Sequence, residues 1–282
     1  MPEATLGWAD FFGAWEIFRD PVLCGIFAGA ALGVLGVYIV LRRVVFMAAV
    51  LSQSAGLGVA LAFWVGMQLD RDVEPMLGAV LLCFVATLLV TVRPERVHLS
   101  REALLGTAWV GAGAAALVVG EAISVEAHDI SSILFGSAVL VRPVDLQLVT
   151  VAAALTLVAH GWLRRGLVFA AFDPDVARVQ GLPVTRLDLV LWLVVALTVS
   201  VSTRALGALP VFALSVLPAL AGLLATSSLT WVFPTALLVG MLSGGLGYVL
   251  AFFESWPVGA SQTLVALGFV AVAGVMRMLR RG

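Results

Sequence analysis

The sequence contains no lysine, and all 16 of its basic residues are arginine. The lysine of a P-loop holds the nucleotide phosphates, so this chain cannot bind and hydrolyse ATP through that motif. The HExxH pair of zinc peptidases and the GxSxG turn of serine hydrolases are absent too. The chain is therefore predicted not to be an enzyme and to bind no cofactor itself, so that any ATP and Mg²⁺ belong to a separate subunit.

Charge and cysteine are also scarce. Charged residues make up 12% of the chain and hydrophobic residues 62%, with a mean hydropathy of +1.11, whereas soluble domains are about a quarter charged. Cys24 and Cys83 lie inside apolar runs, which indicates neither a disulfide framework nor a metal site. The net charge of −1, with arginines spread thinly, argues against nucleic-acid binding. The composition is that of a protein surrounded by membrane lipid.

Nine apolar runs reach the length of roughly 20 residues that a bilayer-spanning helix needs. Lipid offers no hydrogen-bond partners to the backbone, so each run is expected to be helical. The predicted fold is an all-α polytopic bundle of about 8–9 transmembrane helices that forms a single domain over residues 1–282. A shorter run, Ile130 to Val141, is typical of a re-entrant or interfacial piece. The nine runs are Val22 to Leu41, Val45 to Gly66, Met76 to Val92, Ala103 to Gly120, Pro143 to Trp162, Leu187 to Thr203, Gly207 to Ala225, Leu229 to Phe252 and Val258 to Met276.

Arginine is distributed unevenly between the two sets of alternating loops, and this predicts the orientation. Short arginine-rich loops stay cytoplasmic. We therefore expect a multi-pass protein of the cell membrane with its N-terminus outside and its C-terminus in the cytoplasm. One set of loops holds Arg19, Arg71, Arg142 and Arg204, and the other holds Arg42, Arg43, Arg93, Arg96, Arg101, Arg164, Arg165, Arg178, Arg186, Arg277, Arg280 and Arg281.

Residues 1–20 lack the features of a cleaved secretory signal, so we expect them to be retained. Their aromatic residues recur at helical spacing, which is typical of a helix lying in the membrane interface. An aromatic belt ahead of the first span explains the pattern equally well. The residues are Trp8, Phe11, Phe12, Trp15 and Phe18.

Small residues recur at helical spacing on the first and eighth runs. Such faces let two helix backbones approach closely in a membrane. The pattern predicts a tightly packed bundle and carries no information about cargo. The residues are Gly25, Gly29 and Gly33 on the first run and Ala236, Gly240 and Gly244 on the eighth.

The arginine-flanked segment 164–186 carries a compact helix signal. Asp173 is a good N-cap, Pro174 suits the first helical position, and Gly181 stops the helix. The pattern, which also includes Phe172, Asp175 and Ala177, predicts a short helix from Pro174 to Gln180. A plain cytoplasmic cap between two spans satisfies the same signals.

The stretch from Arg164 to Leu189, RRGLVFAAFDPDVARVQGLPVTRLDL, resembles the region that contacts the ATPase in the zinc, manganese and iron permease family of ATP-binding cassette importers. Four further pieces resemble that family in the same order, and together they cover most of the chain. They are VYIVLRRVVFMAAVLSQSAGLGVAL (Val37 to Leu61), DISSILFGS (Asp129 to Ser137), LGALPVFALSVLPALAGLLA (Leu206 to Ala225) and LGYVLAFFESWPVGASQ (Leu246 to Gln262).

The resemblance implies a permease subunit of an ATP-driven importer of divalent metal ions. It implies a homodimer or pseudo-dimer of helical bundles, two bound ATPase subunits that carry ATP and Mg²⁺, and an external solute-binding protein. Residues 164–186 would then be the coupling loop to the ATPase. Phe172 would be its packing anchor, Asp173 its helix cap and Gly181 its chain reversal, with Pro174 and Ala177 completing the motif.

The second run departs from the family pattern. Metal-carrying members place an aspartate, and four residues later a histidine, after the paired arginines, whereas this chain has Ala49 and Gln53. Zinc prefers thiolate, imidazole or carboxylate ligands, so no metal ligand is predicted here. Ser52, Gln53 and Ser54 remain as candidate pathway residues or as hydrogen-bond partners between helices. Selectivity that resides in the binding protein, a non-metal cargo and an impaired copy all remain open.

Two other classes of function fit the sequence less well. A self-sufficient carrier or channel needs its own coupling groups at membrane depth, yet Asp188, Arg204, His160 and Glu254 all fall near span ends, where solvation or snorkelling is the ordinary interpretation. An intramembrane enzyme needs a catalytic pair within the spans, and the sequence shows none.

Overall fold

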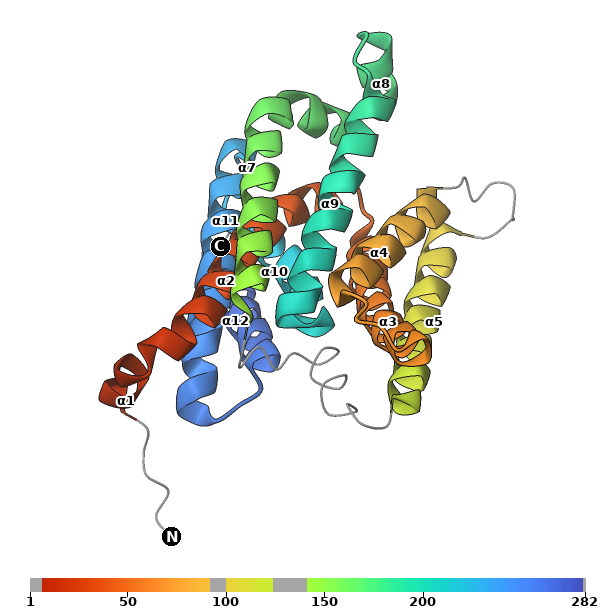
Figure 1. Ribbon diagram of the computed structural model, residues 1–282. Coiled ribbons are helices and arrows are strands. Elements are labelled where there is room, and N and C mark those ends of the chain that lie inside the picture. The colour runs from red at the N-terminus through yellow and green to blue at the C-terminus, as the bar shows by residue number, and fades with distance from the viewer. Residues whose placement is uncertain (1–6, 92–99, 124–140, 281–282) are drawn as a thin grey trace.

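A computed structural model describes residues 7–91, 100–123 and 141–280 of the chain. Every regular element in this described part is a helix (Figure 1). The elements are α1 (Trp8–Gly13), α2 (Trp15–Leu41), α3 (Val45–Leu69), α4 (Pro75–Thr91), α5 (Arg101–Ala122), α7 (Pro143–Phe172), α8 (Pro174–Val179), α9 (Val184–Leu206), α10 (Ala208–Ala225), α11 (Leu229–Glu254) and α12 (Val258–Leu279).

The helices confirm the all-α polytopic fold. Among the described residues, eight helices are long and apolar enough to cross a membrane, and α4, with 17 residues, is a shorter apolar helix. Each predicted span falls on one of these nine helices, in order. Val92, most of the run from Ile130 to Val141, and the piece from Asp129 to Ser137 lie outside the described residues.

Two helices extend well beyond the apolar runs that predicted them. Helix α2 begins at Trp15 and includes Pro21, and α7 continues past Trp162 to Phe172. Apolar composition marks only the part of a helix that lipid surrounds, because a helix needs no apolar surface where it enters water. Residues 164–172 are thus the last turns of α7, and the expected coupling loop is mostly helical.

Aromatic side chains attach the N-terminal helix to the end of α11. The ring centroids of Trp8 and Phe253 are 4.7 Å apart, and those of Phe11 and Phe252 are 5.1 Å apart. Phe11 is buried in this cluster. Phe11 therefore packs within the protein, whereas Trp8, Phe12 and Trp15 are exposed. The interfacial position of the segment stays a prediction.

The glycine faces of α2 and α11 meet each other, which confirms the close packing expected from them. A Cβ atom added at Gly29 would overlap the carbonyl oxygen of Gly240, and one added at Gly25 would overlap that of Gly244. The backbones of the two helices are therefore in direct contact. Gln262 on α12 donates a hydrogen bond from Nε2 to the Gly244 carbonyl oxygen at 3.0 Å, which ties α12 to the same seam.

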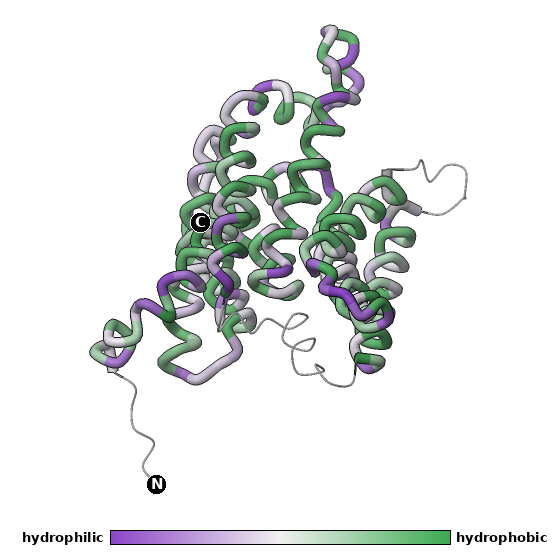
Figure 2. Tube along the Cα trace, viewed as in Figure 1, coloured by the Kyte–Doolittle hydropathy of each residue, from purple (hydrophilic) through white to green (hydrophobic). Residues whose placement is uncertain are grey.

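The helices form two groups with α9 between them (Figure 1). Helices α2, α7, α10, α11 and α12 pack together on one side, and α3, α4 and α5 pack together on the other. Helix α9 contacts both α7 and α4. Helix α8 projects beyond the ends of its neighbours, and Figure 2 shows hydrophilic residues there and in the connection between α3 and α4.

The seam between α2 and α11 gives a stability prediction. Gly29→Ala should lower the free energy of unfolding by about 1–3 kcal/mol, because the new methyl group meets backbone atoms that cannot rotate away. Gly268→Ala on α12 is the matched control, since nothing lies within 4 Å of a Cβ atom there. Thermal unfolding of both purified variants in detergent measures the difference. Equal melting temperatures would show that α2 and α11 are not in backbone contact.

Candidate functional site

Helix α8 begins at a side-chain cap. The Asp173 Oδ1 atom accepts hydrogen bonds from the backbone N–H groups of Asp175 at 3.2 Å and of Val176 at 2.9 Å. Pro174 follows at the first helical position, where its missing N–H leaves no bond unmade. The expected cap is therefore present, and α8 ends one residue before the predicted Gln180.

The chain reverses at Gly181, whose φ of 83° lies in the left-handed region. The Gly181 N–H donates to the carbonyl oxygen of Arg178, and the Leu182 N–H donates to that of Ala177, both at 3.0 Å. These two bonds form the Schellman ending of a helix, which favours glycine because a side chain strains this conformation. The reversal lets α9 start at Val184.

Ala177 seats α8 on the helices that flank it. It is fully buried and packs in a small cluster with Ala170 of α7 and Val184 of α9. A helix this short is unstable by itself, so the packing of Ala177 against α7 and α9 fixes its position. Helix α8 therefore belongs to the same body as the adjoining ends of α7 and α9.

Apolar side chains are exposed on α8 and its flank, beside the ion-paired Asp175 and Arg178. Phe172 is 61% exposed, Val176 is 43% exposed and Val179 is 89% exposed. The structure thus brings the five predicted coupling residues together but gives Phe172 few contacts within this chain. As a packing anchor, Phe172 would need a partner protein.

Buried polar contacts join α2 to α7 and α9 near α8. Arg42 Nη2 donates to Asp188 Oδ1 at 2.6 Å, and the Tyr38 hydroxyl lies 2.8 Å from His160 Nδ1. The Arg42 and Asp188 side chains are only 13% and 32% exposed. The interpretation of Asp188 and His160 as solvated or snorkelling groups is therefore wrong, because both have partners on another helix.

The candidate pathway residues do not form one patch. Successive helix residues point about 100° apart, so Ser52, Gln53 and Ser54 cannot face the same space. Ser52 is buried and donates to the carbonyl oxygen of Ala49 at 3.0 Å within its own helix, and Ser54 is buried as well. Gln53 is partly exposed and faces Gly113 of α5. Its Oε1 atom is buried and has no hydrogen-bond partner among the described residues.

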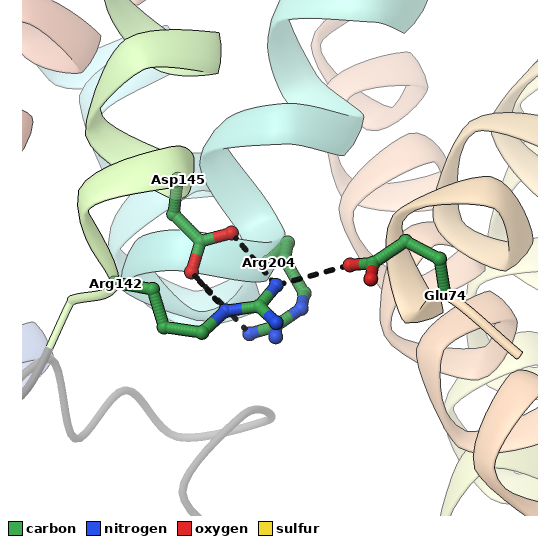
Figure 3. A network of polar contacts seen from close by, with 4 residues as sticks. All are labelled: Glu74, Arg142, Asp145 and Arg204. Carbon is green, nitrogen blue, oxygen red and sulfur yellow. Dashed lines mark hydrogen bonds and ion pairs between the residues drawn. The ribbon is translucent and has the colours of Figure 1, made fainter. Parts of the chain in front are cut away.

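A four-residue ion-pair cluster lies at the ends of α7 and α9 that are far from α8 (Figure 3). Arg142 donates from Nε and Nη2 to the Asp145 carboxylate at 3.0 and 3.2 Å, and from Nη2 to Glu74 Oε1 at 3.0 Å. Arg204 Nη1 lies 3.9 Å from Asp145 Oδ2. Sequence reasoning missed this cluster, and the one local signal for it is the Arg142–Asp145 spacing at a helix start.

The two contacts of Arg142 differ greatly in burial. The Asp145 side chain is 3% exposed, whereas Glu74 is 52% exposed. Hydrogen bonding to Asp145 raises the pKa of Arg142 above its ordinary value, and the bond to Glu74 adds to this. Removing one partner from a buried ion pair costs about 3–5 kcal/mol, while an exposed pair contributes about 0–1 kcal/mol. Arg142 is therefore held firmly by Asp145 and weakly by Glu74.

The cluster borders a cavity of about 970 Å³. One wall comes from α3, the start of α4 and the connection between them, and the other includes Arg142 and Arg204. Within the part of the chain that the structure describes, no group of three or more histidine, cysteine or acidic side chains could hold a metal ion. The cavity is thus lined by charged groups of both signs rather than by a ligand set.

The burial of Asp145 can be tested against an exposed aspartate with the same spacing from its arginine. Asp145→Ala leaves two guanidinium groups without their shared carboxylate and should lower the free energy of unfolding by about 3–5 kcal/mol. Asp175→Ala removes the partner of Arg178, but that carboxylate is 87% exposed, so a loss of about 0–1 kcal/mol is expected. Thermal unfolding compares the two, and similar losses would contradict the burial of Asp145.

Comparisons with known proteins identify the family of the chain. The profile of the ABC 3 transport family matches residues 14–277. The chelated iron transport system membrane protein YfeD of Yersinia pestis is 27% identical over 92% of this chain and 85% of its own. The high-affinity zinc uptake system membrane protein ZnuB of Haemophilus influenzae is 25% identical over 94% of this chain and 99% of its own.

A solved structure shares the fold from end to end. PsaBC from Streptococcus pneumoniae, in complex with Fab, superposes with a TM-score of 0.83 at 21% identity and covers 94% of each chain. The helical architecture is thus one that a solved structure already shows. Since the family profile spans almost all of its residues, the chain belongs to the ABC 3 transport family.

Proposed function

We propose that this chain is the membrane-spanning permease of an ATP-driven importer of divalent transition metal ions. The observation that carries the proposal is α8, a capped helix that projects from the bundle with exposed apolar side chains. A helix so exposed is suited to docking on a partner. Zinc, manganese and iron are the candidate cargoes, and the similarity to the iron transport protein YfeD and the zinc uptake protein ZnuB supports iron and zinc.

The remaining machinery lies outside this chain. A separate ATPase subunit binds ATP and Mg²⁺, an external solute-binding protein delivers the cargo, and a second copy of the permease completes the pathway. Closure of the ATPase pair moves α8, and α8 moves α7 and α9 because Ala177 is buried between them. Such a step is rigid-body switching between two packed states.

The described pathway residues suit passage rather than tight binding. Ala49 has no side-chain ligand for a metal ion. The Gln53 amide oxygen is a neutral ligand, which holds zinc and similar ions more weakly than a carboxylate or an imidazole does. A cation held by neutral oxygen atoms leaves readily. Selectivity in this proposal therefore resides in the external binding protein.

The coupling role of α8 predicts a specific effect at its most exposed apolar residue. Val179→Asp should reduce co-purification of the ATPase subunit about tenfold or more, because burying an apolar side chain contributes about 1.5–3 kcal/mol and a charge there opposes docking. Val179→Ile is the matched control and should retain the ATPase. Thermal unfolding should be the same for both, since Val179 is 89% exposed.

A second variant tests the shape of the same helix. Asp173→Ala combined with Gly181→Pro removes the cap and the left-handed reversal, and should abolish ATP-dependent uptake. Unchanged ATPase association and uptake in this double variant and in Val179→Asp would show that α8 is not the coupling helix.

The cargo is tested by uptake of labelled zinc, manganese and iron into proteoliposomes that contain the assembled complex. We expect ATP-dependent uptake of at least one of them. The double substitution Ala49→Asp and Gln53→His, which adds a carboxylate and an imidazole, should lower the KM for that ion at least severalfold. Gln53→Leu is the control for side-chain volume. No metal uptake by a complex that hydrolyses ATP would reject the metal cargo, and flux without ATP would indicate a carrier or channel.

A further inference from the structure

Helices α7 and α9, together with α8, form a single arm that reaches from one end of the bundle to the other. At the α8 end, Ala177 packs between the two helices. Midway, the hydroxyl groups of Thr156 and Thr198 are hydrogen-bonded at 2.9 Å and buried. At the far end, Asp145 of α7 lies beside Arg204 of α9. The arm is therefore tied together along its length, and a push on α8 reaches its far end.

One ion pair connects this far end to the opposite cavity wall. Arg142 begins the arm, whereas Glu74 belongs to the connection between α3 and α4. Both residues line the cavity of about 970 Å³, and the Arg142–Glu74 contact crosses between its two walls (Figure 3). Helix α9 of the arm also packs against α3 and α4, so the ion pair adds to that packing at the mouth of the cavity.

Burial determines which contact of Arg142 gives way first. The bond to Asp145 is bidentate, lies within one helix start, and has a buried carboxylate as its acceptor. The bond to Glu74 is single and exposed, and it joins residues that are 68 positions apart. Movement of the arm would leave Arg142 with Asp145 and separate it from Glu74.

We propose that Glu74 is a positioning residue for transport, whose ion pair with Arg142 helps to hold the two walls of this cavity together until the arm moves. The inference rests on the proposed function, because the movement comes from an ATPase that acts on α8. The contact made by Glu74 is released and re-formed in each cycle. The Arg142–Asp145–Arg204 group stays intact throughout.

A cysteine reporter in the cavity tests this proposal in the assembled complex. Ala62 is 5% exposed and lines the cavity, so Ala62→Cys should react slowly with a membrane-impermeant maleimide. The parent chain supplies the background rate, since Cys24 and Cys83 are fully buried. Reaction rates are measured in lipid nanodiscs without nucleotide and with ATP plus vanadate, which traps the ATPase.

Neutralising Glu74 should open the cavity. In the nucleotide-free complex, Glu74→Gln should raise the labelling rate of Ala62→Cys about three- to fivefold, the change expected when an exposed ion pair is lost. Glu74→Asp, which keeps the charge, should restore most of the slow labelling. Asp72→Asn is the matched control, because Asp72 is an exposed carboxylate on the same connection and the same cavity wall. Its labelling should stay within about twofold of the unsubstituted chain, the range of a weak surface charge effect.

The outcomes separate this inference from the function on which it rests. Equal labelling of Glu74→Gln and Asp72→Asn, in a complex whose labelling responds to nucleotide, would overturn the role of Glu74 alone. Labelling that never responds to nucleotide, despite ATP hydrolysis by the bound ATPase, would overturn the proposed coupling as well. Unchanged thermal unfolding of Glu74→Gln confirms that the Asp145 group is intact.

Discussion

The backbone contact between α2 and α11 is the constraint on which the rest of the bundle depends. Lipid surrounds apolar side chains as readily as other helices do, so membrane helices associate mainly through close packing and hydrogen bonds. Gly29 and Gly240 allow the two backbones to touch, and Gln262 adds α12 by donating to the Gly244 carbonyl oxygen. Atoms already in backbone contact cannot move closer, and they separate only by losing the whole seam. Helices α2, α11 and α12 therefore provide a fixed body.

The arm packs against α2, α3 and α4 through apolar side chains, and it also makes polar contacts with its neighbours. Tyr38 with His160 and Arg42 with Asp188 join it to α2, and Arg142 with Glu74 joins it to the α3–α4 connection. These are discrete polar contacts, each of which can break while the others hold. A glycine seam gives stiffness, whereas separate polar contacts let one body turn against another.

Much of the fold could be predicted from the sequence because its signals are local. Apolar runs gave the spans, the spacing of Gly25 and Gly29 gave the seam face, and Asp173 with Gly181 gave α8. The polar contacts could not be found in this way. Arg42 and Asp188 are 146 positions apart, and both look like ordinary loop charges until helix packing brings them together. The run from Ser52 to Ser54 looks like one polar patch in the sequence, but neighbours in sequence point in different directions on a helix. Its role in the pathway stays a prediction.

The balance of the charges that line the cavity changes when Glu74 is released from Arg142. Paired as they are, the two arginines and two carboxylates of the cluster sum to zero charge. The α3–α4 connection also carries Asp70, Arg71 and Asp72 on the cavity wall. If Arg142 leaves with the arm, this wall keeps Asp70, Asp72 and Glu74 against Arg71 alone, and its net charge becomes more negative. A wall of that sign attracts a cation, so the movement that widens the cavity would also make it favourable for a metal ion to enter.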